Sequence, residues 1–140
     1  MRKDVLLKVA DHIEFSSELG LNMCSFQNGC GTTACIAGHI VFLENREHFD
    51  KGWVDDIVAI KILCVKSHKE KLNLCKLFFE YSQDVVYDRK RVADVIRHFV
   101  ETDVVDWTYV KPERIDVFDM TETIGSDEVQ TFMKELEQVD

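Results

Sequence analysis

The segment Cys30-Gly31-Thr32-Thr33-Ala34-Cys35-Ile36-Ala37-Gly38-His39 decides how this chain folds. It joins a polar loop to an apolar run and holds two of the six glycines in the chain. A threonine before an apolar run is a common N-cap, so we expect a helix to begin at Thr32 or Thr33 and to continue to about residue 46. Gly38 would lie inside this helix, where glycine costs roughly 1 kcal/mol relative to alanine. Such a cost indicates the close approach of another backbone or of a ligand.

Periodic apolar residues predict further helices on both sides of this segment. The expected helices cover residues 3–17, 53–65, 67–81, 88–102 and 127–138. Ser67 and Asp88 are the expected N-caps of two of them. The helix over 67–81 carries apolar residues on several faces, which predicts a central position. Residues 104–110 could form a short strand or an extended arm, and we favour anchoring of Trp107 to the core.

These elements predict an all-α fold, a compact bundle of about five helices. The bundle would occupy residues 1–107, and residues 108–140 would form an acidic C-terminal extension ending in a helix. No apolar run approaches the roughly 20 residues that span a bilayer, and residues 1–8 contain no apolar segment of signal-peptide length. We therefore expect a cytoplasmic protein that does not bind membranes. The oligomeric state is not readable from the sequence.

Charge is unevenly distributed along the chain. Residues 1–100 carry 14 acidic and 14 basic side chains, whereas residues 101–140 carry 12 acidic and 3 basic ones, which accounts for the net charge of −9. This distribution argues against duplex nucleic acid as a ligand, because phosphate binding needs a basic face. It permits a basic protein partner, although a solvated acidic face is the favoured interpretation.

Cysteine and histidine usage points to a reducing compartment. The five cysteines are an odd number, which fits free thiols better than a disulfide framework. Cys64 and Cys75 lie in apolar helical patterns and are expected to be small buried residues. His12 is expected to be a cap or a surface residue.

Four groups of residues occur in a recognisable order along the chain: Asn22-Met23, Phe26, the segment from Cys30 to Gly38, and Asp106-Trp107. This order resembles a family of small uncharacterised bacterial and phage proteins with the core Cys-Gly-Thr-x-Ala-Cys-Ile-Ala-Gly. The chain departs from the family in having Phe26 where tryptophan is usual, and in its acidic tail. The resemblance implies an all-helical fold but no activity, because none is established for the family. A phage origin would fit interference with a host or defence pathway.

A thiol and an imidazole are placed for nucleophilic chemistry in the deciding segment. Cys35 would lie in the first turn of its helix, where free amides and the helix dipole stabilise a thiolate. His39 follows four residues later on the same face and could act as a base. This pair predicts a thiol-dependent enzyme as the alternative function. The favoured interpretation is that Cys30 and Cys35 are small packing residues.

Metal binding is a weaker alternative at the same place. The candidate zinc ligands are Cys24, Cys30, Cys35 and His39. Their spacings differ from the usual two-residue knuckle, so we expect no cofactor. A redox pair of Cys30 and Cys35 is weaker still, because the C-x-x-C motif is absent.

A helix N-terminus with exposed amides also suits an anion. The candidate ligand-binding residues are Phe26, Gly29, Gly31, Thr32, Thr33, Gly38, His39 and Trp53. No lysine stands where a P-loop would place it. The leading hypothesis is therefore a non-enzymatic helical binding protein. Its partner would be a small anionic or nucleotide ligand at this corner, or a basic host protein bound by the acidic residues 101–140.

Overall fold

The structure is a computed structural model that describes residues 1–27 and 31–112 of the chain. The chain divides into two units, Met1–Val110 and Lys111–Asp140, and all the elements named here belong to the first. In chain order they are α1 (Lys3–Phe15), β1 (Gly20–Leu21), β2 (Thr33–Ala34), α2 (Ile36–Glu44), α3 (Arg46–Asp50), α4 (Asp56–Ile62), α5 (His68–Phe79), a short 3-10 helix (Gln83–Val85) and α6 (Arg89–Thr102). The predicted all-α class is confirmed for this unit, whereas the helix expected over 127–138 lies outside the described residues.

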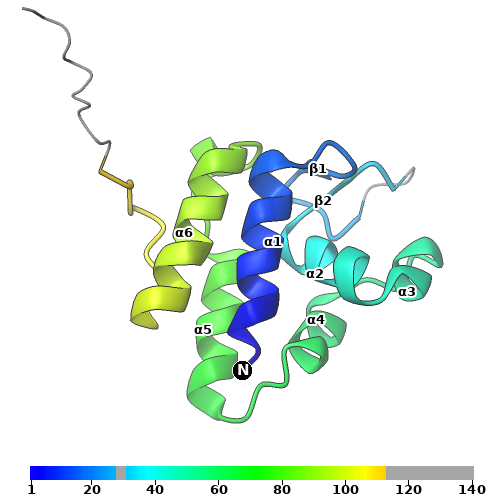
Figure 1. The fold of residues 1–140 in the computed structure, drawn as a ribbon. Coiled ribbons are helices and arrows are strands. Elements are labelled where there is room, and N and C mark those ends of the chain that lie inside the picture. The colour runs from blue at the N-terminus through cyan, green and yellow to red at the C-terminus, as the bar shows by residue number, and fades with distance from the viewer. Residues whose placement is uncertain (28–30, 113–140) are drawn as a thin grey trace, which may run out of the picture. The chain divides into compact units, whose positions relative to one another are not determined.

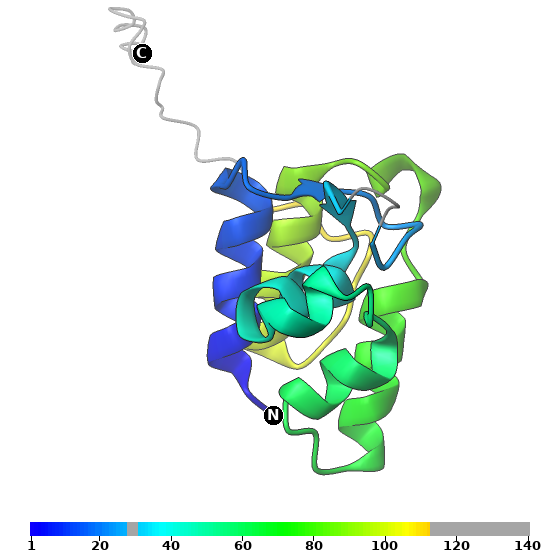
Figure 2. The same ribbon diagram turned by 90° about the vertical axis from the view of Figure 1, so that its right-hand side faces the viewer.

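Helix α2 is the centre of the unit. Every residue from Ile36 to Phe42 is buried, and the helix contacts α1, α3, α4 and β2. A helix that is apolar all round has to be enclosed on every side. Figures 1 and 2 show α1 and α6 running side by side, with α2 next to α1. No helix in the described ranges combines the length and the apolar composition needed to cross a bilayer.

Gly38 allows the loop after β1 to lie directly on α2. A Cβ atom at this position would be 2.0 Å from the carbonyl oxygen of Phe26 and 2.4 Å from the Cβ of Ala34. Real Cβ atoms essentially never come that close to other heavy atoms. Of the two expectations for this glycine, close approach of another backbone is therefore the one that holds.

The predicted helix start at Thr32 or Thr33 is wrong. β2 pairs in parallel with β1, and the amide of Gly20 donates to the carbonyl of Thr32 at 2.8 Å. Backbone groups that are paired between strands cannot also enter a helical hydrogen-bond ladder. The helix therefore begins only at Ile36, with Cys35 as its N-cap.

Helix α5 does not have the central position that its composition predicted. It buries three side chains along one side, Leu74, Leu77 and Phe78. Leu72 and Phe79 are each 50% exposed. The expected N-cap is confirmed, because the hydroxyl of Ser67 accepts the amide of Glu70 at 3.1 Å. The expected cap of α6 is confirmed in the same way by Asp88.

Two other segments differ from expectation in part. α4 ends at Ile62, and Cys64 lies in the turn that follows, with a φ of 55°. The side chain of Cys64, which was expected to be buried, is exposed, and that of Cys75 is half-buried. Residues 104–110 contain no strand, and Trp107 is buried with its indole N–H donating to the carbonyl of Lys76 at 3.0 Å. The favoured anchoring of Trp107 is thus confirmed.

Gly38→Ala should destabilise the protein even though alanine is the better helix former. Helix propensity alone would raise the free energy of unfolding by about 1 kcal/mol. The contact with the Phe26 carbonyl, a backbone atom, should instead lower it by about 2–3 kcal/mol. Urea unfolding followed by circular dichroism distinguishes the two signs, and a stabilised variant would contradict the packing of this loop on α2.

Candidate functional site

Part of the corner predicted to hold a ligand is packed interior: Gly38 and His39 are buried, whereas Thr32 is exposed and Gly31 is half-buried. Cys35 is only 4% exposed, and the side chain of His39 is fully buried. The space beside Gly38 is filled by the backbone of Phe26. Gly31 has a conformational role, because its φ of +69° belongs to the left-handed region that favours glycine. A ligand would have to displace the backbone of Phe26 in order to reach Gly38.

Cys35 and His39 do not form an activated pair. Burial raises the pKa of the Cys35 thiol, and this effect outweighs the nearby amides of Gly38 and Ala37, which favour the thiolate. Nδ1 of His39 lies 2.9 Å from the carbonyl oxygen of Cys35, the geometry of a ring N–H donating to a carbonyl. Burial lowers the pKa of His39 to about 4. Both groups are therefore uncharged at neutral pH.

The aromatic residues expected to line the corner face other partners. The ring of Phe26 meets that of Phe79 edge-on, with centroids 6.2 Å apart. The exposed ring of Trp53 contacts His48 at a centroid distance of 5.4 Å. The ring of His39 contacts that of His12, with centroids 5.4 Å apart, so the three side chains have separate aromatic partners. Gly29, another predicted ligand residue, lies outside the described residues.

The proposed zinc ligands are not gathered in the part of the chain that the structure describes. Within residues 1–27 and 31–112, no three side chains of histidine, cysteine, aspartate or glutamate are placed to hold a metal ion. Cys24 is exposed and accepts a hydrogen bond from the hydroxyl of Tyr81 at 3.5 Å. Cys30, the remaining proposed ligand, lies in the gap between the described ranges.

A buried histidine pair joins α1 to α2. His12, expected at the surface or as a cap, is buried, and its ring centroid lies 5.4 Å from that of His39. Nδ1 of His12 and Nε2 of His39 are both buried without a hydrogen-bond partner. The signal for this was present in the sequence, because His12 follows Val5 and Val9 at helical spacing and so belongs to the buried face of α1.

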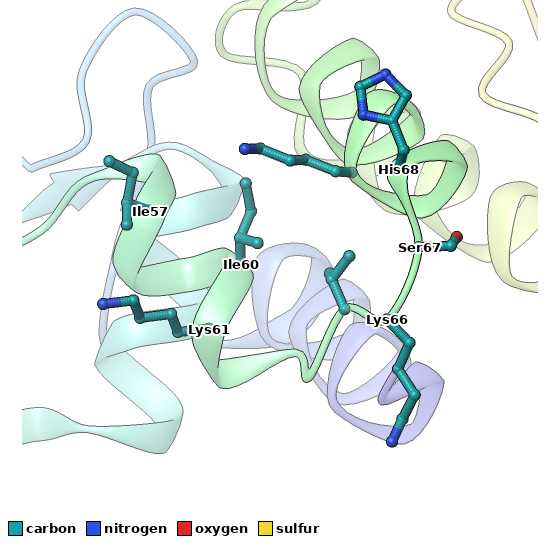
Figure 3. Close-up of a pocket in the computed structure, with 8 residues that line it drawn as sticks. Ile57, Ile60, Lys61, Lys66, Ser67 and His68 are labelled. Carbon is teal, nitrogen blue, oxygen red and sulfur yellow. The ribbon is translucent and has the colours of Figure 1, made fainter.

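A pocket that the sequence analysis missed lies between α4 and α5 (Figure 3). Its volume is about 370 Å³. Its apolar lining comes from Ile57 and Ile60 on α4 and from Val65 in the link to α5. Its basic lining consists of Lys61, Lys66, Lys71 and His68, all exposed. We call this site the lysine-rimmed pocket.

The lysines that line this pocket form no ion pairs within the described residues. Residues 57–79 contain five lysines and a single acidic residue, Glu70. None of the five ammonium groups forms an ion pair with a side chain in the described ranges. Lysines elsewhere in the unit do, as Lys3 pairs with Asp103 at 2.8 Å and Lys8 pairs with Glu44 at 2.6 Å.

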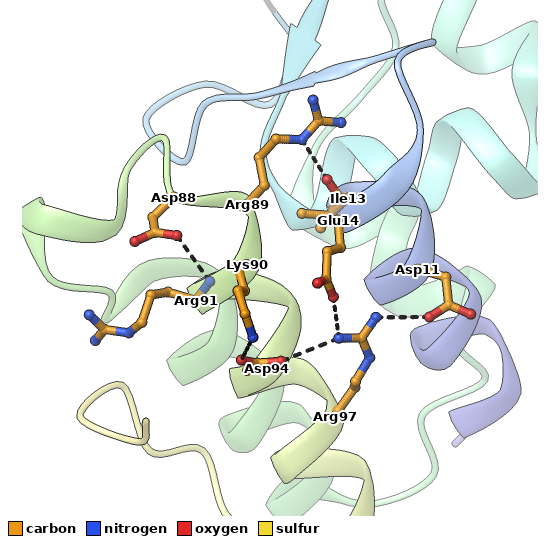
Figure 4. Close-up of polar contacts among 9 residues, drawn as sticks. All are labelled: Asp11, Ile13, Glu14, Asp88, Arg89, Lys90, Arg91, Asp94 and Arg97. Atoms are coloured by element: carbon orange, nitrogen blue, oxygen red, sulfur yellow. Dashed lines mark hydrogen bonds and ion pairs between the residues drawn. The ribbon is translucent and has the colours of Figure 1, made fainter. Parts of the chain in front are cut away.

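Arg97 and Lys90 on α6, in contrast, are paired with carboxylates (Figure 4). The guanidinium of Arg97 contacts Asp11 at 2.9 Å, Glu14, and Asp94 at 3.3 Å. Lys90 also reaches Asp94 at 3.3 Å. The contacts of Arg97 with Asp11 and Glu14 tie α6 to α1, whereas its contact with Asp94 and that of Lys90 lie within α6. The lysines that line the pocket differ from these cations in forming no ion pair within the described residues.

No known protein family, curated protein or solved structure matches this chain. The pocket must therefore be interpreted from its own geometry.

A sequence signal for the pocket existed in the lysine-rich segment 57–79 of an otherwise acidic chain. Averaging charge over residues 1–100 hid that signal, because the acidic residues of α1 and the 44–56 region balance it.

Stability should fall in mild acid because His39 is neutral in the fold. Its pKa is about 4 when folded and about 6.5 when unfolded, so between these values only the unfolded chain binds the proton. Neutral His39 makes its full contribution to the free energy of unfolding above pH 6.5. As the pH falls to about 4, about 3 kcal/mol of this free energy is lost. Urea titrations across this pH range measure the slope. In His39→Gln the free energy of unfolding should fall less steeply with decreasing pH, because the titrating imidazole is absent. An unchanged slope in that variant would assign the loss of stability in acid to other groups.

Iodoacetamide should label Cys24 and Cys64 much faster than Cys35 in the folded protein. The first two thiols are exposed, whereas Cys35 is buried with a raised pKa. Peptide mass spectrometry at short reaction times would give the rates, with urea-unfolded protein as the reference for equal reactivity. Rapid labelling of Cys35 in the folded protein would contradict a neutral, enclosed thiol and would favour the thiol-dependent enzyme.

Proposed function

We propose that this chain is a non-enzymatic binding protein that takes an anionic partner at the lysine-rimmed pocket. The observation that supports this is the meeting of an apolar pocket with lysines that have no counter-charge in the described part of the chain. Lys61, Lys66 and Lys71 line this pocket from three separate positions on α4, the link and α5. Unpaired cations around a concavity attract and orient an anion.

The ligand class is the anionic one predicted from the sequence, but its site is the lysine-rimmed pocket rather than the corner at Gly38 and His39. The corner around Gly38 and His39 is enclosed, so an anion there would require the loop at Phe26 to move away. The pocket between α4 and α5 opens to solvent beside exposed lysines. An anion could reach it without rearrangement of the core. Recognition of a basic partner by residues 101–140 stays a prediction, since most of that segment lies outside the described residues.

Binding is favoured over catalysis because the described contacts pair no nucleophile with an activated base at either site. The thiol and imidazole of the corner are uncharged and buried. The hydroxyl of Ser67, which lines the pocket, serves as the N-cap of α5 by accepting the amide of Glu70. The pocket's lysines can hold an anion, and within the described residues no hydrogen bond or ion pair couples their ammonium groups to His68 or to a carboxylate.

Fluorescence anisotropy with a labelled oligoglutamate peptide at low salt tests this function. The wild-type chain should bind the peptide, and the triple variant Lys61→Gln, Lys66→Gln, Lys71→Gln should bind it at least about tenfold more weakly. The affinity should fall as salt is added, because exposed charges are screened.

The matched control is the triple variant Lys3→Gln, Lys8→Gln, Lys90→Gln. It removes the same total charge, but from lysines that are paired elsewhere on the unit. Its affinity should stay close to that of the wild type. Equal losses in the two triple variants would reduce the effect to net charge and would remove the pocket as the site.

A further inference from the structure

We infer that the anionic partner is an acidic amphipathic helix, whose apolar side enters the lysine-rimmed pocket while its carboxylates meet the lysines. This inference rests on the proposed function, since it names the partner of the same pocket. It is carried by the chemistry of the pocket, by the exposed apolar side of α5 and by the distribution of charge. Each of these can be followed in the described residues.

The inside of the pocket is apolar while its charges are exposed. Ile57, Ile60 and Val65 line it, and the lysine side chains beside them reach solvent. A small anion such as phosphate would use the lysines and leave the apolar walls in contact with water. A segment that carries both apolar side chains and carboxylates would bury the walls and also neutralise the lysines.

The apolar surface continues from the pocket along α5. His68 and Lys71 line the pocket, and Leu72, Cys75 and Phe79 follow them at spacings of three and four residues, which places all five on one side of the helix. This side extends over about 16 Å. Across the pocket, Ile57 on α4 is 58% exposed. The surface is thus a strip about three helical turns long rather than an isolated cavity.

The occupant is a helix because the site is bounded by two helices. An extended peptide binds by adding a strand to a sheet edge, whereas an amphipathic helix binds in an apolar groove. The only strands in the described ranges, β1 and β2, are two residues long and pair with each other. Walls formed by α4 and α5 match the second mode, in which anchors recur at every third or fourth residue.

Charge selects an acidic protein segment over a nucleic acid. The three lysines of the pocket, which form no ion pair within the described residues, favour any polyanion, but the chain as a whole carries a net charge of −9. Long-range repulsion therefore acts on every anion and opposes most strongly a DNA or RNA backbone, which carries many charges and needs an extended basic face. A short helix places its few carboxylates beside Lys61, Lys66 and Lys71 and adds apolar contacts that a phosphate backbone lacks.

The test compares two synthetic peptides of identical composition, one with leucines along a single helical face among glutamates and one with the same residues scrambled. Fluorescence anisotropy should give at least about tenfold tighter binding of the amphipathic peptide to the full chain. Circular dichroism of the mixture should show a gain of helix over the sum of its components. A labelled DNA duplex serves as the competing polyanion.

The variants Ile57→Ser and Leu72→Ser test the apolar strip without touching a lysine. Both side chains are at least half exposed, so the fold should tolerate the changes. Each should weaken binding of the amphipathic peptide about fivefold or more, and Leu72→Ser, which lies outside the pocket lining, should leave oligoglutamate binding unchanged. Phe15→Ser is the matched control, because Phe15 is 75% exposed at the end of α1 and is not part of the pocket.

The outcomes separate this inference from the proposed function. Equal binding of the amphipathic and scrambled peptides, lost in the pocket lysine triple variant, would overturn the helix and leave the anion-binding function standing. Failure of both peptides and of oligoglutamate to bind would overturn both. DNA binding as tight as that of the amphipathic peptide, or unchanged peptide affinity in Ile57→Ser and Leu72→Ser, would also overturn the acidic helix.

Discussion

The missing side chain at Gly38 is the constraint on which this fold depends. Because residue 38 has no Cβ, the carbonyl of Phe26 can lie against α2, and the loop that carries it can close one side of the helix. The pairing of β1 with β2 fixes the ends of the same loop. α1 and α4 cover other sides, so an almost wholly apolar helix becomes fully enclosed. The buried thiol and imidazole of this segment are consequences of that enclosure.

The surface between α4 and α5 follows from the same arrangement. Since α2 occupies the centre, α5 lies at the periphery and buries only one side of itself. Leu72 and Phe79 are left half exposed, although the helix is apolar enough to have been predicted central. An exposed apolar face beside unpaired lysines is unusual for a side of the molecule that has no partner. Our proposal therefore places recognition at this combination rather than at the cysteine-rich corner.

Local signals in the sequence predicted much of the fold. Ser67 and Asp88 act as N-caps where expected, because a cap depends on residues within one turn. Thr33 failed as a cap because its backbone pairs with β1, a contact that no local pattern encodes. The lysine-rimmed pocket could not be predicted from the sequence for a similar reason. Whether Lys66 or Lys71 has a counter-charge depends on which acidic residues come near it in space, and the sequence does not state those distances.

The first and last helices of the unit depend directly on each other. Arg89, at the start of α6, donates to the carbonyl of Ile13 in α1 at 2.6 Å, across 76 positions of sequence. Contacts between such distant segments form late, because a long loop must close first. During synthesis α1 therefore leaves the ribosome long before its partner exists. The side of α1 that packs on α6 stays uncovered until α6 emerges, so the nascent chain exposes apolar surface throughout that interval.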